Sequence, residues 1–355
     1  MPEQSSLAPR LLAWYERHGR KDLPWQIDPT PYRVWVSEIM LQQTQVTTVL
    51  GYYARFMERF PDVVALAGAP VDDVLHLWSG LGYYARGRNL HRAAQRIRDE
   101  HQGVFPDTVD GLTSLPGIGR STAGAILALS AGARLPILDG NVKRVLTRFH
   151  GIDEWPGRSA IEKRLWTLAE AHLPTTRLRA YTQGIMDLGA TVCVRSRPVC
   201  AACPLESDCV ARREHRQAEI PARKPRVDLP TRETVFVVVR DAQGAVLLER
   251  RPPAGIWGGL WSFPECGRDA DLGQWCVRNL GSTAAEVRWL EPIRHGFSHY
   301  RLNIHPAVVT LGSRPTGGAG QIMEGPERVW YNGASPLGLA APVSRLLEDL
   351  ARLEI

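Results

Sequence analysis

Four cysteines, Cys193, Cys200, Cys203 and Cys209, form a C-x6-C-x2-C-x5-C pattern. Four thiolates so close in sequence can bind one metal centre, either zinc or a [4Fe–4S] cluster. Structural zinc sites usually use two separate C-x2-C pairs, whereas this run has one close pair flanked by two more distant cysteines. We therefore expect a [4Fe–4S] cluster. The alternatives are two disulfides, which do not suit a chain without a secretion signal, and unrelated buried thiols.

The length and charge of the chain narrow the classes of protein it can belong to. A chain of 355 residues predicts two or three domains. The first 226 residues carry a net charge of +7 and the rest −1, which favours a polyanion as partner of the first part; an arginine-rich composition is the alternative. No apolar run is long enough to cross a bilayer, and the N-terminus has no signal core. We expect a cytoplasmic, nucleoid-associated protein without a membrane partner.

The periodicity of apolar residues divides the chain. From Thr30 to about Lys224 it predicts helices, the first capped by Thr30 with Pro31 next, and others near 71–78, 87–101, 121–131, 141–149, 159–172 and 177–189. Residues 214–230 have the composition of a linker. Beyond it, 234–240 and 245–251 predict a β-hairpin, with more strands near 285–310 and 328–331 and a final helix at 342–353. The second part is therefore α+β.

Two segments combine glycine-rich turns with helix starts. In LPGIGRSTAGAI (115–126), Pro116, Gly117 and Gly119 predict a tight turn whose amides, with those of the next helix, can bind a DNA phosphate; an ordinary helix–helix turn is the alternative. In ILDGNVKRV (137–145), Asp139 is expected to cap a helix that begins near Asn141. A carboxylate held by amides should have a depressed pKa, stay ionised, and be able to stabilise a developing cation.

Two other segments carry polar side chains among apolar ones. In WVSEIMLQQTQV (35–46), Glu38 lies among residues that predict burial, so its pKa should be raised as a general acid requires; a solvated glutamate is the alternative. Glu38, Gln42 and Gln45 are expected on one helical face, and the amides and hydroxyl of Gln42, Gln43 and Thr44 suit base edges. In 78–90, Tyr83 can wedge into a base stack while Arg86 and Arg88 meet phosphates, or the tyrosines can simply pack in the core.

These segments together resemble the MutY family of adenine DNA glycosylases. The shared motifs are LPWQ (23–26), 35–46, GLGYYARGRNL (80–90), 115–126, 137–145, the four cysteines and FSH (297–299), in order along nearly the whole chain. The resemblance implies an all-α helix-hairpin-helix glycosylase domain with a [4Fe–4S] cluster loop, followed by an α+β Nudix-like domain. The implied boundaries are 1–226 for the glycosylase region and 231–355 for the Nudix-like domain. Within the first, about 30–136 form a six-helix module, 1–29 with 137–213 a cluster module, and 214–230 the linker.

The resemblance also implies a reaction and the residues that carry it. The enzyme would flip out and excise adenine mispaired with 8-oxoguanine or guanine in double-stranded DNA, acting as a monomer in base excision repair. Glu38 would protonate the adenine and help activate water, and Asp139, supported by Asn141, would stabilise the oxocarbenium ion. The remaining implied sites are the adenine pocket (Leu23, Trp25, Val46, Gln183), intercalation around 8-oxoguanine (Gln43, Thr44, Leu81, Tyr83), further DNA contacts (Ser121, Lys143) and 8-oxoguanine recognition (Phe297, Ser298, His299).

Two departures from related patterns shape this prediction. Ser121 stands where endonuclease III relatives carry a lysine nucleophile, so a Schiff base and strand cleavage are not expected there, although Lys143 could trap substrate adventitiously. Between Cys266 and Leu290 the acids are Asp269, Asp271 and Glu286, too few for the carboxylate cluster of a Nudix hydrolase. The competing hypotheses are an endonuclease III-like bifunctional glycosylase, a non-catalytic DNA-binding iron–sulfur protein and a nucleotide pyrophosphohydrolase.

Overall fold

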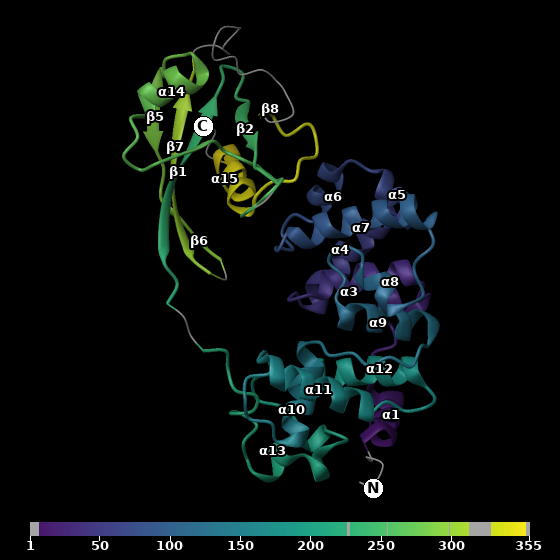
Figure 1. Cartoon of the computed structure of the whole chain (residues 1–355). Helices are drawn as coiled ribbons and strands as arrows, with labels where there is room; N and C mark the ends of the chain where they lie inside the picture. The colour runs from purple at the N-terminus through teal and green to yellow at the C-terminus, as the bar shows by residue number, and fades with distance from the viewer. Residues whose placement is uncertain (1–6, 226–227, 254, 298, 312–327, 353–355) are drawn as a thin grey trace. The chain divides into compact units, whose positions relative to one another are not determined.

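The computed structural model describes residues 7–225, 228–253, 255–297, 299–311 and 328–352 (Figure 1). It divides into two compact units, residues 1–68 with 89–226, and residues 69–88 with 227–355. The first unit is helical. Its helices are α1 Leu7–His18, α2 Pro24–Ile27, α3 Pro31–Leu41, α4 Val46–Arg59, α5 Val63–Gly68, α7 Ala85–His101 (which starts in the other unit), α8 Val109–Thr113, α9 Arg120–Ala131, α10 Gly140–His150, α11 Ser159–Ala171, α12 Leu178–Asp187 and α13 Val210–Arg213.

Local sequence signals explain where α3 begins but not where it ends. The Thr30 side chain accepts a hydrogen bond from the backbone N–H of Arg33, and Pro31 follows as the first helical residue, as predicted. The helix stops at Leu41, and Gln43 has a left-handed backbone with φ 59°. The prediction of one helical face carrying Glu38, Gln42 and Gln45 is therefore wrong, because residues 42–45 form a turn between α3 and α4.

Close backbone approach requires glycine beside α9. A Cβ on Gly124 would lie 2.6 Å from the carbonyl oxygen of Pro136, so the extended segment before Asp139 crosses α9 in direct contact with its backbone. A hydrophobic core joins α1, α10, α11 and α12, with Leu11, Leu146 and Leu165 fully buried. The extended segment and this core together determine the position of the α10 N-terminus.

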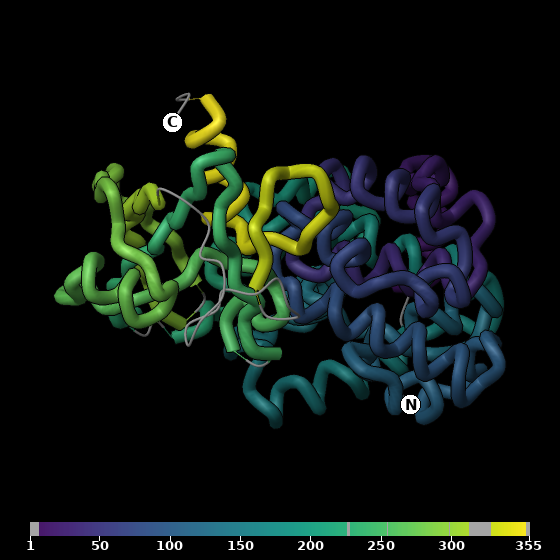
Figure 2. Tube along the Cα trace, turned by 90° about the horizontal axis from the view of Figure 1, so that it is seen from above, coloured from purple at the N-terminus to yellow at the C-terminus, as the bar shows by residue number. Residues whose placement is uncertain are grey.

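The second unit contains a mixed sheet. Its elements are α6 Val71–Leu77, β1 Thr231–Arg240, β2 Val246–Arg250, β3 Trp261–Ser262, β4 Glu265–Cys266, α14 Leu272–Leu280, β5 Glu286–Trp289, β6 Ile293–Gly296, β7 Arg301–Thr310, β8 Arg328–Tyr331 and α15 Ala341–Arg352. The strand order is β3-β2-β1-β7-β5, with β1 and β7 parallel along their full length. In the Cα trace these strands are extended runs, whereas the helical unit consists of short helices (Figure 2).

The apolar run in β1 is buried on both faces, as its unbroken pattern indicates. Val235, Val237 and Val239 pack with Cys276 of α14, while the Phe236 ring on the other face contacts the ring of Phe263. The predicted hairpin to β2 is present: Asp241 accepts hydrogen bonds from the backbone of residues 243 and 245. In the same unit, Asp72 of α6 accepts hydrogen bonds from the side chains of Arg250 and Trp261.

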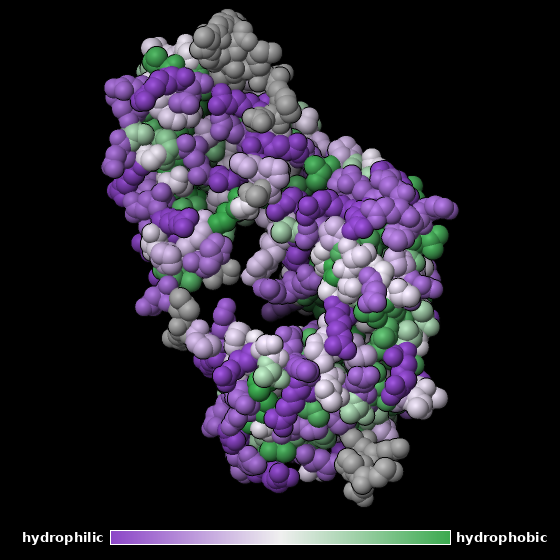
Figure 3. All heavy atoms as spheres, in the orientation of Figure 1, coloured by the Kyte–Doolittle hydropathy of each residue, from purple (hydrophilic) through white to green (hydrophobic). Residues whose placement is uncertain are grey.

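One face of the molecule is mostly hydrophilic, with apolar residues in small separate groups (Figure 3). Among the described residues, no helix is both long and apolar enough to span a bilayer.

Candidate active site

Two carboxylates from different helices act on one another in the helical unit. Glu38 lies in α3, surrounded by buried side chains that include Trp35 and Ile39. Asp139 is the residue that caps α10, and its Oδ1 accepts a hydrogen bond of 2.7 Å from the backbone N–H of Val142. Each side chain keeps limited solvent access. The structure thus combines two acids that the sequence separates by a hundred residues.

The pKa of Glu38 is raised to about 8, first because burial penalises the carboxylate and second because Asp139 is negative. At neutral pH the side chain therefore carries a proton. A protonated carboxyl with a pKa near the working pH is what a general acid needs. The prediction of a raised pKa for Glu38 is confirmed.

The prediction of a depressed pKa for Asp139 is wrong, because burial outweighs the favourable contacts and raises it. Those contacts still favour the ionised form: the Val142 and Asn141 backbone amides, the Asn141 side chain and the charge of Arg144. Arg144 also donates 2.7 Å hydrogen bonds to Asn141 Oδ1 and to the carbonyl of Gly189. The carboxylate of Asp139 is therefore held in place by these contacts in a mostly buried site that would favour a neighbouring cation.

Ser121 stabilises the segment that leads to Asp139. Its Oγ accepts a hydrogen bond of 2.9 Å from the backbone N–H of Leu138. The sequence left the role of this side chain open, since its partner lies seventeen residues away in the chain. In the turn before α9, Gly117 has φ 81° and Gly119 caps α9 with no side-chain hydrogen bond; a Cβ on Gly119 would meet nothing within 4 Å. The open space beside this helix N-terminus suits the approach of an anionic backbone.

Among the predicted pocket residues, Leu23 and Trp25 are buried, and the Trp25 ring meets Tyr53 edge-on at 5.2 Å. Val46 begins α4 and is partly exposed. Gln183 is buried in α12.

The Gln183 amide is oriented by a residue that sequence reasoning missed. Its Nε2 donates to Oδ1 of buried Asp187 at 2.9 Å, and Asp187 in turn accepts from the backbone N–H of Arg20 at 2.8 Å and from its guanidinium. A carboxylate accepts only, so the amide nitrogen of Gln183 must face it. One turn of helix separates the two residues, and the Arg20 contact has no sequence signal.

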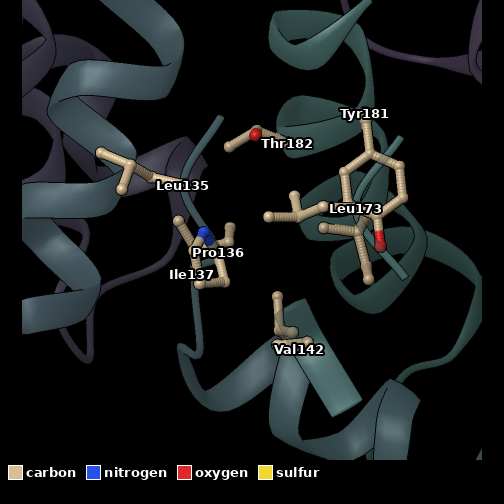
Figure 4. A pocket seen from close by; sticks show the side chains of 9 residues that line it. Leu135, Pro136, Ile137, Val142, Leu173, Tyr181 and Thr182 are labelled. Atoms are coloured by element: carbon tan, nitrogen blue, oxygen red, sulfur yellow. The ribbon is translucent and has the colours of Figure 1, made fainter. Parts of the chain in front are cut away.

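A small cavity in this unit lies apart from this site. It is lined by residues of 135–137, α10, α11 and α12 and by Leu173 just after α11, with Ile137 and Tyr181 among the side chains around it (Figure 4). Its volume is about 10 Å³, close to the room that one water needs. A nucleobase cannot enter it, and it includes none of the predicted site residues.

The other predicted DNA-contacting side chains lie on turns or in ion pairs. Gln42, Gln43 and Thr44 form the turn between α3 and α4, with Gln43 exposed. Lys143 Nζ is 2.6 Å from Glu162 Oε1, so its amine is engaged by a carboxylate.

In the other unit, Tyr83 is 54% exposed, whereas Leu81 and Arg86 are buried; Arg88 is partly exposed. Arg86 directs its guanidinium to backbone carbonyls of its own loop.

The four cysteines line one small cavity of about 20 Å³ with Arg148 and Gln217. None of the four is in a disulfide. Burial, with a smaller contribution from the neighbouring cysteines, raises the pKa of Cys203 to about 12 and also raises the pKa of Cys209. Thiolates crowded in this way need a cationic centre.

The residues around this cavity form a donor set that an iron–sulfur cluster can use. Four cysteines line it together. A cubane binds each thiolate through a different iron, so its cysteines surround a shared space instead of one point. Buried Arg148 donates to Cys193 Sγ at 3.4 Å and to the carbonyl of Val194 at 2.8 Å, which braces the loop from the α10 side. The residues therefore fit a [4Fe–4S] group.

The third predicted constellation lies at the β6–β7 turn of the second unit. Phe297 stacks near Trp257, His295 and Tyr300, with ring centroids 5.2, 4.6 and 4.7 Å away. His299 follows at 6.3 Å, and Ser298 lies outside the described residues. Sequence reasoning missed Trp257, a tryptophan with φ 53° in the loop between β2 and β3.

Comparisons with known proteins agree with this arrangement. The family model described as "HhH-GPD superfamily base excision DNA repair protein" matches residues 36–171, and the model of the NUDIX domain matches residues 234–349. The adenine DNA glycosylase of Buchnera aphidicola subsp. Acyrthosiphon pisum (strain APS) is 38% identical over 347 residues, covering 96% of this chain and 97% of that protein. The adenine DNA glycosylase of Homo sapiens is 36% identical, covering 82% of this chain and 64% of that protein.

Solved structures share the fold of the helical part. A thermostable thymine-DNA glycosylase matches with a TM-score of 0.53 and 24% identity, covering 59% of this chain and 97% of that one. A non-covalent endonuclease III–DNA complex matches with a TM-score of 0.51 and 19% identity, covering 61% of this chain and 99% of that one.

Proposed function

The chain belongs to the adenine DNA glycosylase family, and from this premise we propose that it excises adenine paired with 8-oxoguanine or guanine in duplex DNA. The observation that carries the proposal is the carboxyl of Glu38, with a pKa of about 8, beside the rigidly capped Asp139. One acid supplies a proton to a leaving base, and the other supplies negative charge for a sugar cation.

Hydrolysis of the N-glycosidic bond would begin with adenine outside the base stack. Glu38 donates its proton to a ring nitrogen, which makes the base a better leaving group. As the bond to the sugar breaks, positive charge develops on the sugar, and Asp139 stabilises it without moving, because Val142 and Asn141 hold the carboxylate. Glu38, now ionised, accepts a proton from the attacking water, which regenerates the acid.

The amines and hydroxyls near Asp139 support a monofunctional reaction. Ser121 is engaged by the Leu138 amide and carries no amine. Lys143 is paired with Glu162. An amine engaged by a carboxylate is less available as a nucleophile. The product would be an intact abasic strand that breaks only in hot alkali.

The cysteine loop would hold a [4Fe–4S] cluster through Cys193, Cys200, Cys203 and Cys209. When bound, the cluster would cross-link residues 193–209 into a rigid surface loop. Arg195 and Arg197 lie in that loop, and their charge suits a phosphate backbone. Purified protein should contain about four irons per chain; one zinc and no iron after anaerobic purification would contradict this part.

The C-terminal unit would recognise the partner base rather than hydrolyse nucleotides. Helix α14 carries no carboxylate, and Asp271 is used as its cap, accepting a hydrogen bond from the Gln274 N–H at 3.1 Å. Phe297, Ser298 and His299 are the proposed contacts to 8-oxoguanine. A single chain contains both proposed sites, so a monomer suffices.

Single-turnover assays on A·8-oxoguanine, A·G and thymine-glycol duplexes, with and without alkali, test the function. We expect adenine release from the first two and strand breaks only after alkali. Asp139→Asn should bind the duplex and lose most of the rate, because charge rather than shape faces the cation. Release of thymine glycol, or stoichiometric cleavage without alkali, would favour an endonuclease III-like lyase instead.

A further inference from the structure

The loop that presents Tyr83 has an unusual backbone. Gly80, Gly82 and Tyr83 have φ of 93°, 72° and 47°. The left-handed region is open to glycine but unfavourable for a tyrosine, so neighbouring contacts must stabilise it. The Tyr83 side chain is 54% exposed and makes little of the packing that would explain this conformation.

Those contacts come from Arg86, in the first turn of α7. Its Nη2 donates to the carbonyl of Leu81 at 3.0 Å and to that of Gly82 at 3.1 Å. The guanidinium lies 5.5 Å from the Trp78 ring centroid and 5.8 Å from that of Tyr83. Trp78 Nε1 donates to the Gly82 carbonyl as well, at 3.3 Å.

The environment of Arg86 is that of an internal brace. The residue is 9% exposed, and burial lowers the pKa of its guanidinium to about 10, so it remains charged at neutral pH. Its Nη2 is directed to the carbonyl groups of Leu81 and Gly82, on either side of the left-handed residue Gly82. The planar guanidinium also lies close to the Trp78 and Tyr83 rings, a packing that the compact ammonium of a lysine does not reproduce. An arginine that contacts DNA phosphates would instead place its head in solvent.

We propose that Arg86 is a positioning residue that holds residues 79–84 in the conformation presenting Tyr83 to the base stack. The proposal rests on the proposed function in one respect, that Tyr83 acts as a wedge in the duplex. It replaces the sequence-based interpretation of Arg86 as a phosphate contact. Holding the loop before DNA binds removes an ordering cost from the binding step, so the brace acts on mispair affinity through Tyr83.

The test uses full-length protein with Arg86→Met, which keeps the stem, and Arg86→Lys, which keeps the charge. Hydrogen–deuterium exchange of the free enzyme should be faster in 79–84 for both variants. Affinity for an A·8-oxoguanine duplex should fall on the order of tenfold for both. The slope of log affinity against log salt should stay unchanged, whereas loss of a phosphate contact would reduce it by about one. Arg92→Met, on the exposed face of the same helix, is the matched control.

Two further variants keep the proposal falsifiable if Arg86→Met does not fold. Gly82→Ala adds a Cβ that meets nothing within 4 Å at φ 72°, so it strains the loop without touching Arg86 and should reproduce the phenotype. In a Tyr83→Ala background, Arg86→Lys should have no further effect on affinity.

Three results would each overturn the proposed role of Arg86. They are unchanged hydrogen–deuterium exchange in 79–84, wild-type affinity and salt slope in Arg86→Lys after both were lost in Arg86→Met, or an equal loss of affinity when Arg86→Lys is made in the Tyr83→Ala background. If the exchange result holds while wild-type protein releases no adenine, the proposed function fails and the brace stands.

Discussion

Replacing Glu38 by glutamine should stabilise the protein while abolishing its chemistry. The folded protein holds the Glu38 proton up to a pKa of about 8, whereas the unfolded chain releases it near the ordinary value of 4.5. Between these values the unfolded state binds fewer protons, so wild-type stability falls as pH rises. Glutamine has the same shape and does not titrate, so the variant does not show this loss.

The magnitude follows from the pKa difference. The full shift corresponds to about 3 kcal/mol at pH 7 and about 5 kcal/mol above pH 8, at 1.36 kcal/mol per pKa unit. The side chain keeps some solvent access, which reduces the penalty for ionisation. We therefore expect Glu38→Gln to raise the free energy of unfolding by about 1–3 kcal/mol at pH 7, with the gain growing up to pH 8 and vanishing below about pH 4.5.

Urea unfolding under anaerobic conditions, followed by a helix-sensitive signal at pH 6, 7, 8 and 9, measures this difference. Glu58→Gln, on the exposed surface of α4, is the matched control and should follow wild type at every pH. In parallel, the single-turnover rate of wild type should decline above about pH 8 as the proton is lost. Parallel stability profiles for wild type and Glu38→Gln from pH 6 to 9, or a less stable variant, would refute the reasoning.

Three other substitutions test neighbouring parts of the structure. Ser121→Ala leaves the Leu138 amide without its acceptor, so we expect a loss of about 1–2 kcal/mol in the free energy of unfolding. The single-turnover rate should also fall, without strand cleavage. An unchanged rate and stability would show that this hydrogen bond contributes to neither. In Asp187→Asn the Gln183 amide is no longer held in one orientation and can rotate, so the ratio of adenine release to hypoxanthine release should fall. Adding Gln183→Glu to this variant should restore the ratio. A wild-type ratio in Asp187→Asn alone would contradict the orienting role. The double variant Phe297→Ala, His299→Ala should show a smaller preference for A·8-oxoguanine over A·G in rate and affinity. Trp289→Ala, at an exposed position of β5, is the control and should keep the preference. Full discrimination by the double variant would exclude a recognition role for these two side chains.

Residues with a local signal could be predicted from the sequence. Thr30 followed by proline marks the start of α3, and Asp139 before a helix is a cap, because capping needs only neighbours within three residues. The hairpin after β1 is determined by Asp241 and a glycine with positive φ. The raised pKa of Glu38 also followed from sequence, since the apolar residues around it in α3 ensure burial.

Tertiary structure decided whatever depends on partners far apart in the chain. The pKa of Asp139 depends on the balance between burial and amide contacts, and only the packed site shows that burial wins. The partners of Ser121 and Asp187 are distant segments, and the guanidinium of Arg86 turns inward to its own loop although its neighbours in sequence predict a surface charge. The sequence by itself determined which side chains can do the chemistry, because residue type and short-range spacing define acids, caps and thiolates. The tertiary structure decided which of them are desolvated, paired or oriented, because those properties arise from contacts whose sequence separation no local pattern records.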